Sequence, residues 1–355
     1  MKRIDITLLL CVIFLTLFGL FMIYDASSFV AYRDFLDKYH YIKGQAFWVV
    51  LGFIFMIFFS YFDYHRLYNL SLPILVVALG LLLLVFIPGI GVHLLGAHRW
   101  INTGFFLLQP GEFVKLALAV YLASWLSTKE KGRLGAFLLL LGIIMLLVVL
   151  EPDMGTAVVI LSEALIVYFL SGGNLLYFAG LIPAVLAIGF IAIKISPYRL
   201  KRLESFFNIN QSIQSSSYHI KQILIALGSG GIFGVGLSNS LQKYAYLPET
   251  TTDSIFAIIA EELGFIGATL IIIVFAIVIW RGFLIATKAR DNFGKLLAGG
   301  ITSFLAIQVI INLSAQTVLI PLTGIPLPFI SYGGSALIID LCSIGILLNI
   351  SRKSL

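Results

Sequence analysis

Charged side chains are scarce in this sequence of 355 residues: Asp, Glu, Lys and Arg together make up 11% of the chain. Soluble domains carry about a quarter of such residues, so this composition excludes an ordinary soluble domain. Hydrophobic residues make up 60% of the chain and gather in long, unbroken runs. Inside lipid only helices and closed barrels satisfy the backbone, and continuous apolar runs favour helices over the alternating pattern of a barrel.

Cysteine is almost absent, with Cys11 and Cys342 lying in expected helices near opposite ends of the chain. A disulfide framework is therefore not expected, and the chain has no CxxC spacing that indicates a metal site. The net charge of +6 comes from basic residues dispersed among loops. This distribution suits a protein that faces anionic membrane lipid and gives no support for nucleic-acid binding.

The apolar runs predict an all-α polytopic membrane protein with about ten transmembrane helices in a single domain over residues 1–355. Each run approaches the roughly 20 residues that cross a bilayer, and the shorter ones borrow flanking residues. The expected spans cover residues 6–24, 46–62, 71–87, 112–127, 135–151, 155–171, 175–194, 253–280, 296–319 and 332–350.

Lys and Arg in the short connections predict the orientation. With the N-terminus inside, the inner segments hold 12 of these residues and the short outer loops hold 4. Both termini are therefore expected in the cytoplasm, and an even number of spans agrees with this. The protein is predicted to be a multi-pass protein of the cytoplasmic (inner) membrane.

The longest connection, residues 195–252, is predicted to be an extracytoplasmic loop between the seventh and eighth spans. It contains the amphipathic stretch YRLKRLESFF, which is expected on the membrane surface. A Gly-rich stretch follows, ALGSGGIFGVGLSNS, and its glycines predict a re-entrant or partly buried element rather than a spanning helix. Irregular backbone at membrane depth requires shielding by protein or a wet cavity.

Several charged residues fall inside the expected spans. Glu112 and Lys115 are three residues apart on one helix face, which predicts either a structural ion pair or part of a functional site. Glu163 and Asp340 lie in the middle of their spans, where a charge requires a partner or water. No partner for either is visible in the sequence.

Asp253 is the strongest candidate for a functional residue, because it ends the long loop and begins a span in LPETTTDSIFAIIAEELG. One interpretation is a helix N-cap, a position that Asp favours. The other is a general base whose pKa is raised by its surroundings. Glu261 and Glu262 follow about two helical turns later, and Glu261 faces closer to Asp253.

Several long motifs together resemble the FtsW/RodA family, also called the shape, elongation, division and sporulation (SEDS) proteins. They occur in the family's order over almost the whole chain and read IDITLLL…GLFMIYDASS, GAHRWINTGFFLLQPGEFVKLALAVYLA, EPDMGTAVVI, ALGSGGIFGVGLSNSLQKYAYLPETTTDSIFAIIAEELGFIGA and LPFISYGGSALI…GILLNIS. QKYAYLPE and the closing LNIS resemble the division-type FtsW branch. The stretch FFNINQSIQSSSYHIKQ and Asp340 depart from the family pattern.

The resemblance implies a ten-span glycosyltransferase that polymerises lipid II, an undecaprenyl-pyrophosphate disaccharide-pentapeptide, into peptidoglycan strands. It also implies a class B penicillin-binding protein as partner. The family's essential carboxylate follows Thr in a TD motif, which maps onto Thr252-Asp253. Two other classes stay open: a transporter that flips a lipid-linked precursor, and a scaffold of the division machinery without catalysis.

For the glycosyltransferase, Asp253 is the predicted base, and a single displacement predicts inversion at the anomeric carbon. The pyrophosphate charge needs neutralisation, by Arg99, Lys115 or Lys243 or by a divalent cation such as Mg²⁺ or Mn²⁺. Arg99 has a second interpretation as an interfacial residue that snorkels to the headgroups. The remaining predicted substrate contacts are Glu112, Glu261 and Ser331 of the SYGGS motif.

Overall fold

The structure is a computed structural model of the chain. It describes residues 4–94, 97–104, 106–128, 133–173, 197–207, 215–244 and 247–354, together with the single residues Tyr177, Gly180, Pro183, Gly189 and Lys194.

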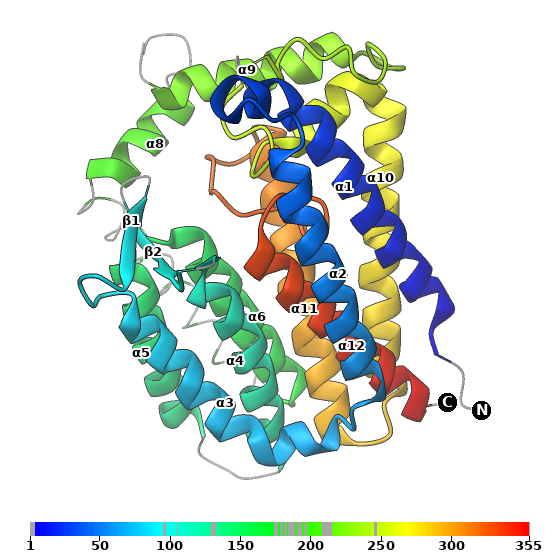
Figure 1. The fold of residues 1–355 in the computed structure, drawn as a ribbon. Coiled ribbons are helices and arrows are strands. Elements are labelled where there is room, and N and C mark those ends of the chain that lie inside the picture. The colour runs from blue at the N-terminus through cyan, green and yellow to red at the C-terminus, as the bar shows by residue number, and fades with distance from the viewer. Residues whose placement is uncertain are drawn as a thin grey trace.

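Helices dominate the described part of the chain (Figure 1). Their bounds are α1 Ile6–Phe35, α2 His40–Tyr61, α3 His65–Leu84, α4 Pro110–Leu126, α5 Leu134–Leu150, α6 Met154–Leu170, α8 Pro197–Phe207, α9 Ser215–Gly230, α10 Ile255–Lys288, α11 Asn292–Gln316 and α12 Gly334–Ser354. Every expected span except 175–194 coincides with one of these helices. That exception falls largely outside the described residues.

Six of the described helices, α1, α2, α3, α10, α11 and α12, are long and apolar enough to cross a membrane. In α11, 78% of the most apolar stretch is buried, and in α12 72%, whereas α2 buries 22% of its stretch. The two C-terminal helices therefore form the centre of the bundle. The others expose apolar side chains such as Phe47 and Trp280, as helices in contact with lipid do.

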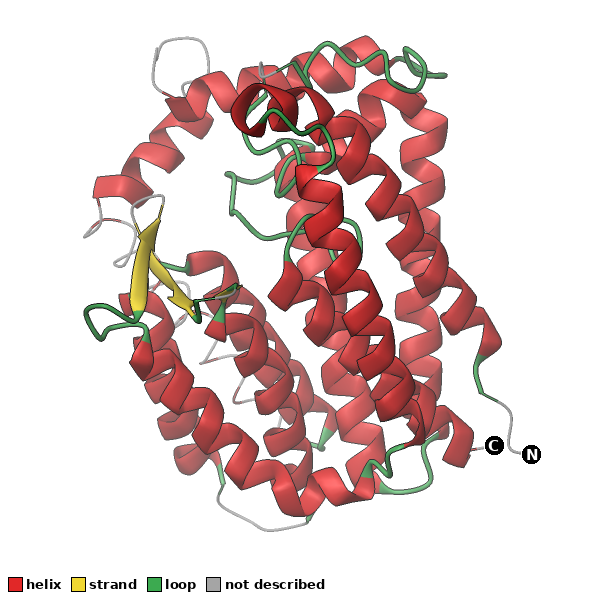
Figure 2. Cartoon of the chain, viewed as in Figure 1, coloured by secondary structure: helices red, strands yellow, loops and turns green. Residues whose placement is uncertain are grey.

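A small antiparallel sheet between α3 and α4 corrects the all-α prediction (Figure 2). Its strands are β1 Gly91–Leu94, β2 Ala97–Asn102 and β3 Leu107–Leu108, in the order β1-β2-β3. Gly91 pairs with Ile101, and Ile101 pairs with Leu108 on the other side. The segment is too short to span, and hairpin pairing satisfies backbone groups that a loose loop would leave to water.

The two termini lie together at one end of the bundle, and α8 and α9 lie across the opposite end (Figure 1). The N-terminal end of α10 and the C-terminal end of α11 lie at this second end as well, because α10 and α11 run antiparallel through a short connection at residues 289–291. The helix α8 coincides with the amphipathic stretch expected from the sequence.

The helix α10 is broken at Gly264, whose φ of 67° belongs to the left-handed region. The Gly-rich segment 231–236 crosses the break so closely that a side chain at Gly264 would collide with the backbone of Gly234. Four backbone hydrogen bonds join the two segments: Val235 N to Glu261 O, Gly236 N to Glu262 O, Phe265 N to Gly231 O and Ile266 N to Ile232 O. The groups released by the break are thereby paired, as buried irregular backbone requires.

Candidate active site

A cavity of about 330 Å³ lies beside Asp253, at the end of the bundle opposite to the termini. The loop that precedes α10 contributes Glu249 and Asp253 to its wall. Other wall residues are Arg202 from α8, His219 from α9 and Gln316 from α11. Segments far apart in the sequence therefore enclose one polar space around the predicted base.

Other elements hold the backbone on either side of Asp253. Three carbonyl groups of the loop accept hydrogen bonds, namely Thr251 O from Tyr332 N (2.8 Å), Thr252 O from Ser331 Oγ (2.6 Å) and Asp253 O from Asn312 Nδ2 (3.2 Å). Ser331 in turn accepts a bond from Leu327 N at 2.9 Å. The SYGGS motif thus positions the TD motif, and Ser331 reaches the site through the backbone of Thr252.

The N-cap interpretation of Asp253 is wrong. The residue that caps α10 is Ser254, and no side-chain hydrogen bond caps this helix. Ser254 Oγ instead makes a 2.7 Å hydrogen bond with His219 Nε2. The carboxyl group of Asp253 is therefore not used to cap the helix and lines the cavity.

The surroundings of Asp253 suit proton transfer. Burial raises the pKa of Asp253 to about 8, and the neighbouring carboxyl group of Glu249 adds to this shift, while Arg202 and Arg99 oppose it. Glu249 has a φ of 53°, a left-handed conformation that is uncommon for residues other than glycine. Glu249 O accepts hydrogen bonds from Thr252 N and Ser254 N. These bonds close a turn that holds the carboxyl groups of Glu249 and Asp253 together.

Two arginines supply positive charge near the carboxyl pair. Arg202 lines the cavity and donates to Leu322 O at 2.9 Å. Arg99 lies on β2, donates to Pro152 O at 2.6 Å and acts electrostatically on both Asp253 and Glu151. Arg99 does not line the cavity, but its effect on Asp253 favours a role near the site over that of a snorkelling interfacial residue. A contact of Arg99 with substrate stays a prediction.

Glu112 and Lys115 form an ion pair of 2.7 Å, and each side chain is 2% exposed. Neither lines the cavity beside Asp253. Lys115 acts electrostatically on Glu163 and Asp340 instead, so these four residues from α4, α6 and α12 share one region inside the bundle. This placement favours the structural ion pair, and a substrate contact by Glu112 or Lys115 stays a prediction.

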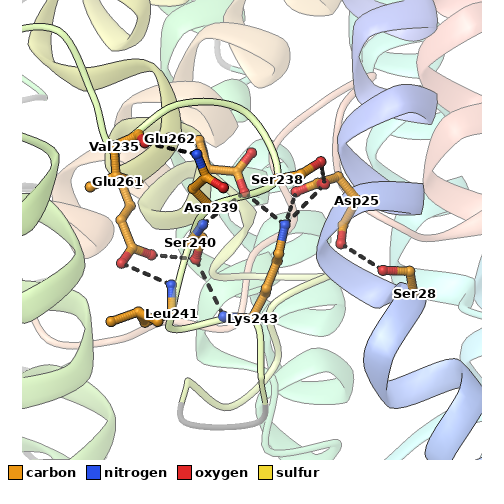
Figure 3. Close-up of polar contacts among 10 residues, drawn as sticks. All are labelled: Asp25, Ser28, Val235, Ser238, Asn239, Ser240, Leu241, Lys243, Glu261 and Glu262. Carbon is orange, nitrogen blue, oxygen red and sulfur yellow. Dashed lines mark hydrogen bonds and ion pairs between the residues drawn. The ribbon is translucent and has the colours of Figure 1, made fainter.

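Lys243 is held between two carboxylates (Figure 3). Its Nζ lies 2.9 Å from Asp25 Oδ2 and 3.0 Å from Glu262 Oε1, and Ser238 Oγ donates to Asp25 at 2.6 Å. Because its ammonium group already bonds both carboxylates in a buried position, the structure favours a structural role over the predicted contact with pyrophosphate.

Glu261 is bound by the same loop (Figure 3). It accepts hydrogen bonds from Ser240 Oγ, from Leu241 N at 3.3 Å and from Ser229 Oγ at 3.3 Å. Glu261 does not line the cavity either. Its carboxylate fastens segment 238–241 to α10, and a contact with substrate stays a prediction.

Polar and charged residues of the cavity that were not predicted from the sequence include Arg202, His219, Glu249, Asn312 and Gln316. Glu249 carried a usable signal, because it lies four residues before Asp253 in the same motif. Arg202 and His219 lie in a long loop whose folding onto α10 and α11 leaves no pattern in the sequence.

Comparison with known proteins decides the family. The family model described as cell cycle protein, covering FtsW, RodA and SpoVE, matches residues 5–355. This chain belongs to the FtsW/RodA/SpoVE family. The stage V sporulation protein E of Bacillus subtilis (strain 168) is 43% identical over 358 residues, which cover 99% of this chain and 97% of that protein.

Other relatives carry an enzyme's name. A probable peptidoglycan glycosyltransferase FtsW of Trichlorobacter lovleyi is 41% identical and covers 98% of this chain and 93% of its own length. One of Geobacter sp. (strain M18) is 38% identical, with 98% and 97% covered. The FtsW/RodA/SpoVE family thus includes full-length relatives named as glycosyltransferases as well as one named for sporulation.

Solved structures share the fold. A chain from a study of the structural coordination of polymerization and crosslinking by a peptidoglycan synthase complex superposes with a TM-score of 0.81 and 24% identity, covering 100% of this chain and 99% of that chain. The rod shape determining protein RodA of Thermus thermophilus gives 0.73 and 24%, with 99% and 97% covered. At this identity the likeness concerns the fold, and it confirms a polytopic helical membrane protein.

Proposed function

We propose that this chain is a peptidoglycan glycosyltransferase that polymerises lipid II on the outer face of the cytoplasmic membrane. The observation that carries the proposal is the position of Asp253, which lines a polar cavity with Glu249 and Arg202. Full-length relatives named as peptidoglycan glycosyltransferases support the reaction class. A carboxylate with a raised pKa next to cationic side chains fits attack by a sugar hydroxyl on a phosphorylated sugar.

In the proposed reaction, Asp253 takes the proton of the acceptor sugar's 4-hydroxyl group as that oxygen attacks the anomeric carbon of the donor. The bond to undecaprenyl pyrophosphate breaks on the opposite side, which inverts the anomeric configuration. Arg202 and Arg99 receive the negative charge that develops on the pyrophosphate. Arg202 was not predicted from the sequence. In this proposal it neutralises the pyrophosphate charge, a role that the sequence analysis gave to Lys243.

A divalent cation such as Mg²⁺ or Mn²⁺ stays part of the proposal. Within the described residues no group of three or more His, Cys, Asp or Glu side chains is gathered to hold an ion. Mg²⁺, however, is commonly bound by one or two carboxylates together with substrate phosphates. Glu249 offers one such carboxylate beside the base, and an ion bound by it together with the substrate phosphates would neutralise phosphate charge.

The proposed membrane arrangement has ten spans, both termini in the cytoplasm and the loop 195–252 outside. Two observations support it: the termini share one end of the bundle, and the inner segments hold 12 Lys and Arg residues against 4 in the short outer loops. The cavity beside Asp253 then lies toward the outer leaflet. There it can receive a substrate whose polyprenyl tail stays in the membrane.

A class B penicillin-binding protein is the proposed partner, since new glycan strands need crosslinking. The structural neighbour described as part of a peptidoglycan synthase complex, in which polymerization and crosslinking are coordinated, supports this pairing. The partner would join the strands that this chain extends.

The test is polymerisation of labelled lipid II by the purified chain in liposomes, with and without the penicillin-binding partner. We expect glycan strands from the wild-type protein and none from Asp253→Asn. Movement of lipid II across the bilayer without glycan product would identify a flippase instead. Recruitment of partners with neither product nor lipid movement would leave a scaffold.

A further inference from the structure

The C-terminal part of α11 forms one wall of the cavity with two amide side chains. Asn312 and Gln316 both line the cavity, and their residues are 1% and 2% exposed. They lie four residues apart, on one face of the helix and about 6 Å apart along its axis. Asn312 is the nearer to the predicted base, because its amide nitrogen bonds the backbone of Asp253.

The orientation of the Asn312 amide is fixed by its neighbours. Its Nδ2 donates to Asp253 O at 3.2 Å and to Ile325 O at 2.8 Å. Both partners are carbonyl oxygens, so turning the amide over would set its own oxygen against two acceptors. Nδ2 therefore stays where it is, and Asn312 Oδ1 must find its donor elsewhere.

In the described part of the chain, neither Asn312 Oδ1 nor Gln316 Oε1 has a hydrogen-bond partner. A buried acceptor without a donor costs about 1–3 kcal/mol, so such atoms are usually satisfied in the working protein. Ala315, Leu322 and Ile325 beside them offer apolar side chains to the cavity. The wall is therefore built to receive a group that brings donors and apolar surface together.

We propose that Asn312 and Gln316 form a subsite for an acceptor sugar that carries a 2-acetamido group. This inference rests on the proposed function. It further identifies which groups of the acceptor sugar the protein recognises. With the 4-hydroxyl group at the Asp253 carboxylate, the 3-hydroxyl group donates to Asn312 Oδ1. The acetamido N–H then donates to Gln316 Oε1.

The order of the acceptors along the protein matches the order of the donors on the sugar. The 4-hydroxyl, 3-hydroxyl and 2-acetamido groups occupy consecutive ring positions, and Asp253, Asn312 and Gln316 follow one another along the cavity. The apolar side chains of Ala315 and Ile325 receive the acetyl methyl group. A sugar with a substituent on its 3-oxygen cannot donate to Asn312, so the subsite requires a free 3-hydroxyl group on the acceptor.

The decisive variant is Gln316→Met, which keeps the size of the side chain and removes the acceptor without touching the hydrogen bond to Asp253. It is assayed with lipid II and with an analogue in which the acceptor's 2-acetamido group is replaced by a 2-O-acetyl ester. The ester keeps the methyl and carbonyl groups and loses only the N–H. We expect the wild-type protein to show a KM about tenfold higher for the analogue.

For Gln316→Met we expect a KM for natural lipid II about tenfold above wild type and equal to its KM for the analogue. Gln308→Met is the matched control, because Gln308 is also buried on α11 but does not line the cavity. This control should discriminate between the substrates as wild type does, and thermal unfolding should show that both variants are folded. A Gln316→Met protein that still discriminates like wild type overturns the subsite, and so does a wild-type protein that accepts both substrates equally. Failure of the wild-type protein to polymerise either substrate overturns the proposed function instead.

Discussion

Lys243 and Asp253 lie ten residues apart in one loop, yet their charged groups have opposite surroundings. Around Lys243 the charges are closed on one another, because Asp25 and Glu262 both bond its ammonium group in a buried position (Figure 3). Around Asp253 a carboxyl pair faces a cavity with an arginine in its wall. Removing one partner from a buried ion pair destabilises a fold, whereas a charge that faces a cavity can also contact a ligand.

This difference assigns the loop two roles. Its first part fastens α1 to α10 through Lys243 and Glu261, and its last part presents Asp253 to the cavity. The break of α10 at Gly264 lets the first part cross the helix at backbone distance. The first part of the loop can therefore hold Asp253 in place when substrate binds.

Loss of the base should have the largest effect on activity. Asp253→Asn removes the group that takes the hydroxyl proton, and a general base contributes about 10²–10⁴-fold to a rate. We expect kcat for lipid II polymerisation to fall by at least that much, with expression and thermal unfolding unchanged. Asp34→Asn, at an exposed carboxylate paired with Arg33, is the control and should retain full activity. Normal polymerisation by Asp253→Asn would remove Asp253 from the mechanism.

Loss of the buried cation should act on stability. Lys243→Met leaves Asp25 and Glu262 buried without their shared partner, and breaking such a pair costs about 3–5 kcal/mol. Thermal unfolding in detergent should show a large drop for this variant. Neutralising all three residues together, as Asp25→Asn, Lys243→Met and Glu262→Gln, should restore much of it. Loss of polymerisation with unchanged unfolding would instead show that Lys243 acts on substrate, as the sequence analysis predicted.

The described membrane helices could be predicted from sequence because each leaves a local signal, and Asp253 was proposed as the base from the resemblance to the family. A run of apolar residues long enough for a bilayer marks a helix, and the TD motif marks Asp253. The partner of Lys243 could not be predicted, because Asp25 lies 218 residues away and pairs with it only through tertiary packing. Arg202 reached the cavity in the same way, through the folding of a long loop over the bundle. The sheet at residues 91–108 was missed because its strands are two to six residues long and follow no clear alternation.

The carboxyl pair in the cavity should be visible in the pH dependence of the reaction. Asp253 acts as a base only when it is deprotonated, and its pKa of about 8 means that the rate should rise with pH through that region. Glu249→Gln removes the neighbouring carboxyl group that helps to raise this pKa. The rising limb of the pH–rate profile should therefore move to lower pH in this variant.

A control separates this effect from a general change in charge. Glu204→Gln removes a carboxylate from the exposed side of α8, outside the cavity wall, and should leave the pH profile where it is. An unchanged profile in Glu249→Gln would show that Glu249 does not influence the group that titrates. An equal shift in both variants would point to the net charge of the outer surface.

The smallest effect is expected where a residue acts on Asp253 through the backbone. Ser331→Ala removes the hydroxyl group that donates to Thr252 O, and one such hydrogen bond is worth about 0.5–1.5 kcal/mol. We expect kcat to fall about two- to tenfold with little change in KM, because the base is displaced while the cavity remains. Ser343→Ala is the matched control, since this buried hydroxyl bonds Ile339 O within its own helix at 2.7 Å. A raised KM with unchanged kcat in Ser331→Ala would instead show that Ser331 contacts substrate directly, as its motif predicted. Ser331 would then act like the residues that face the cavity.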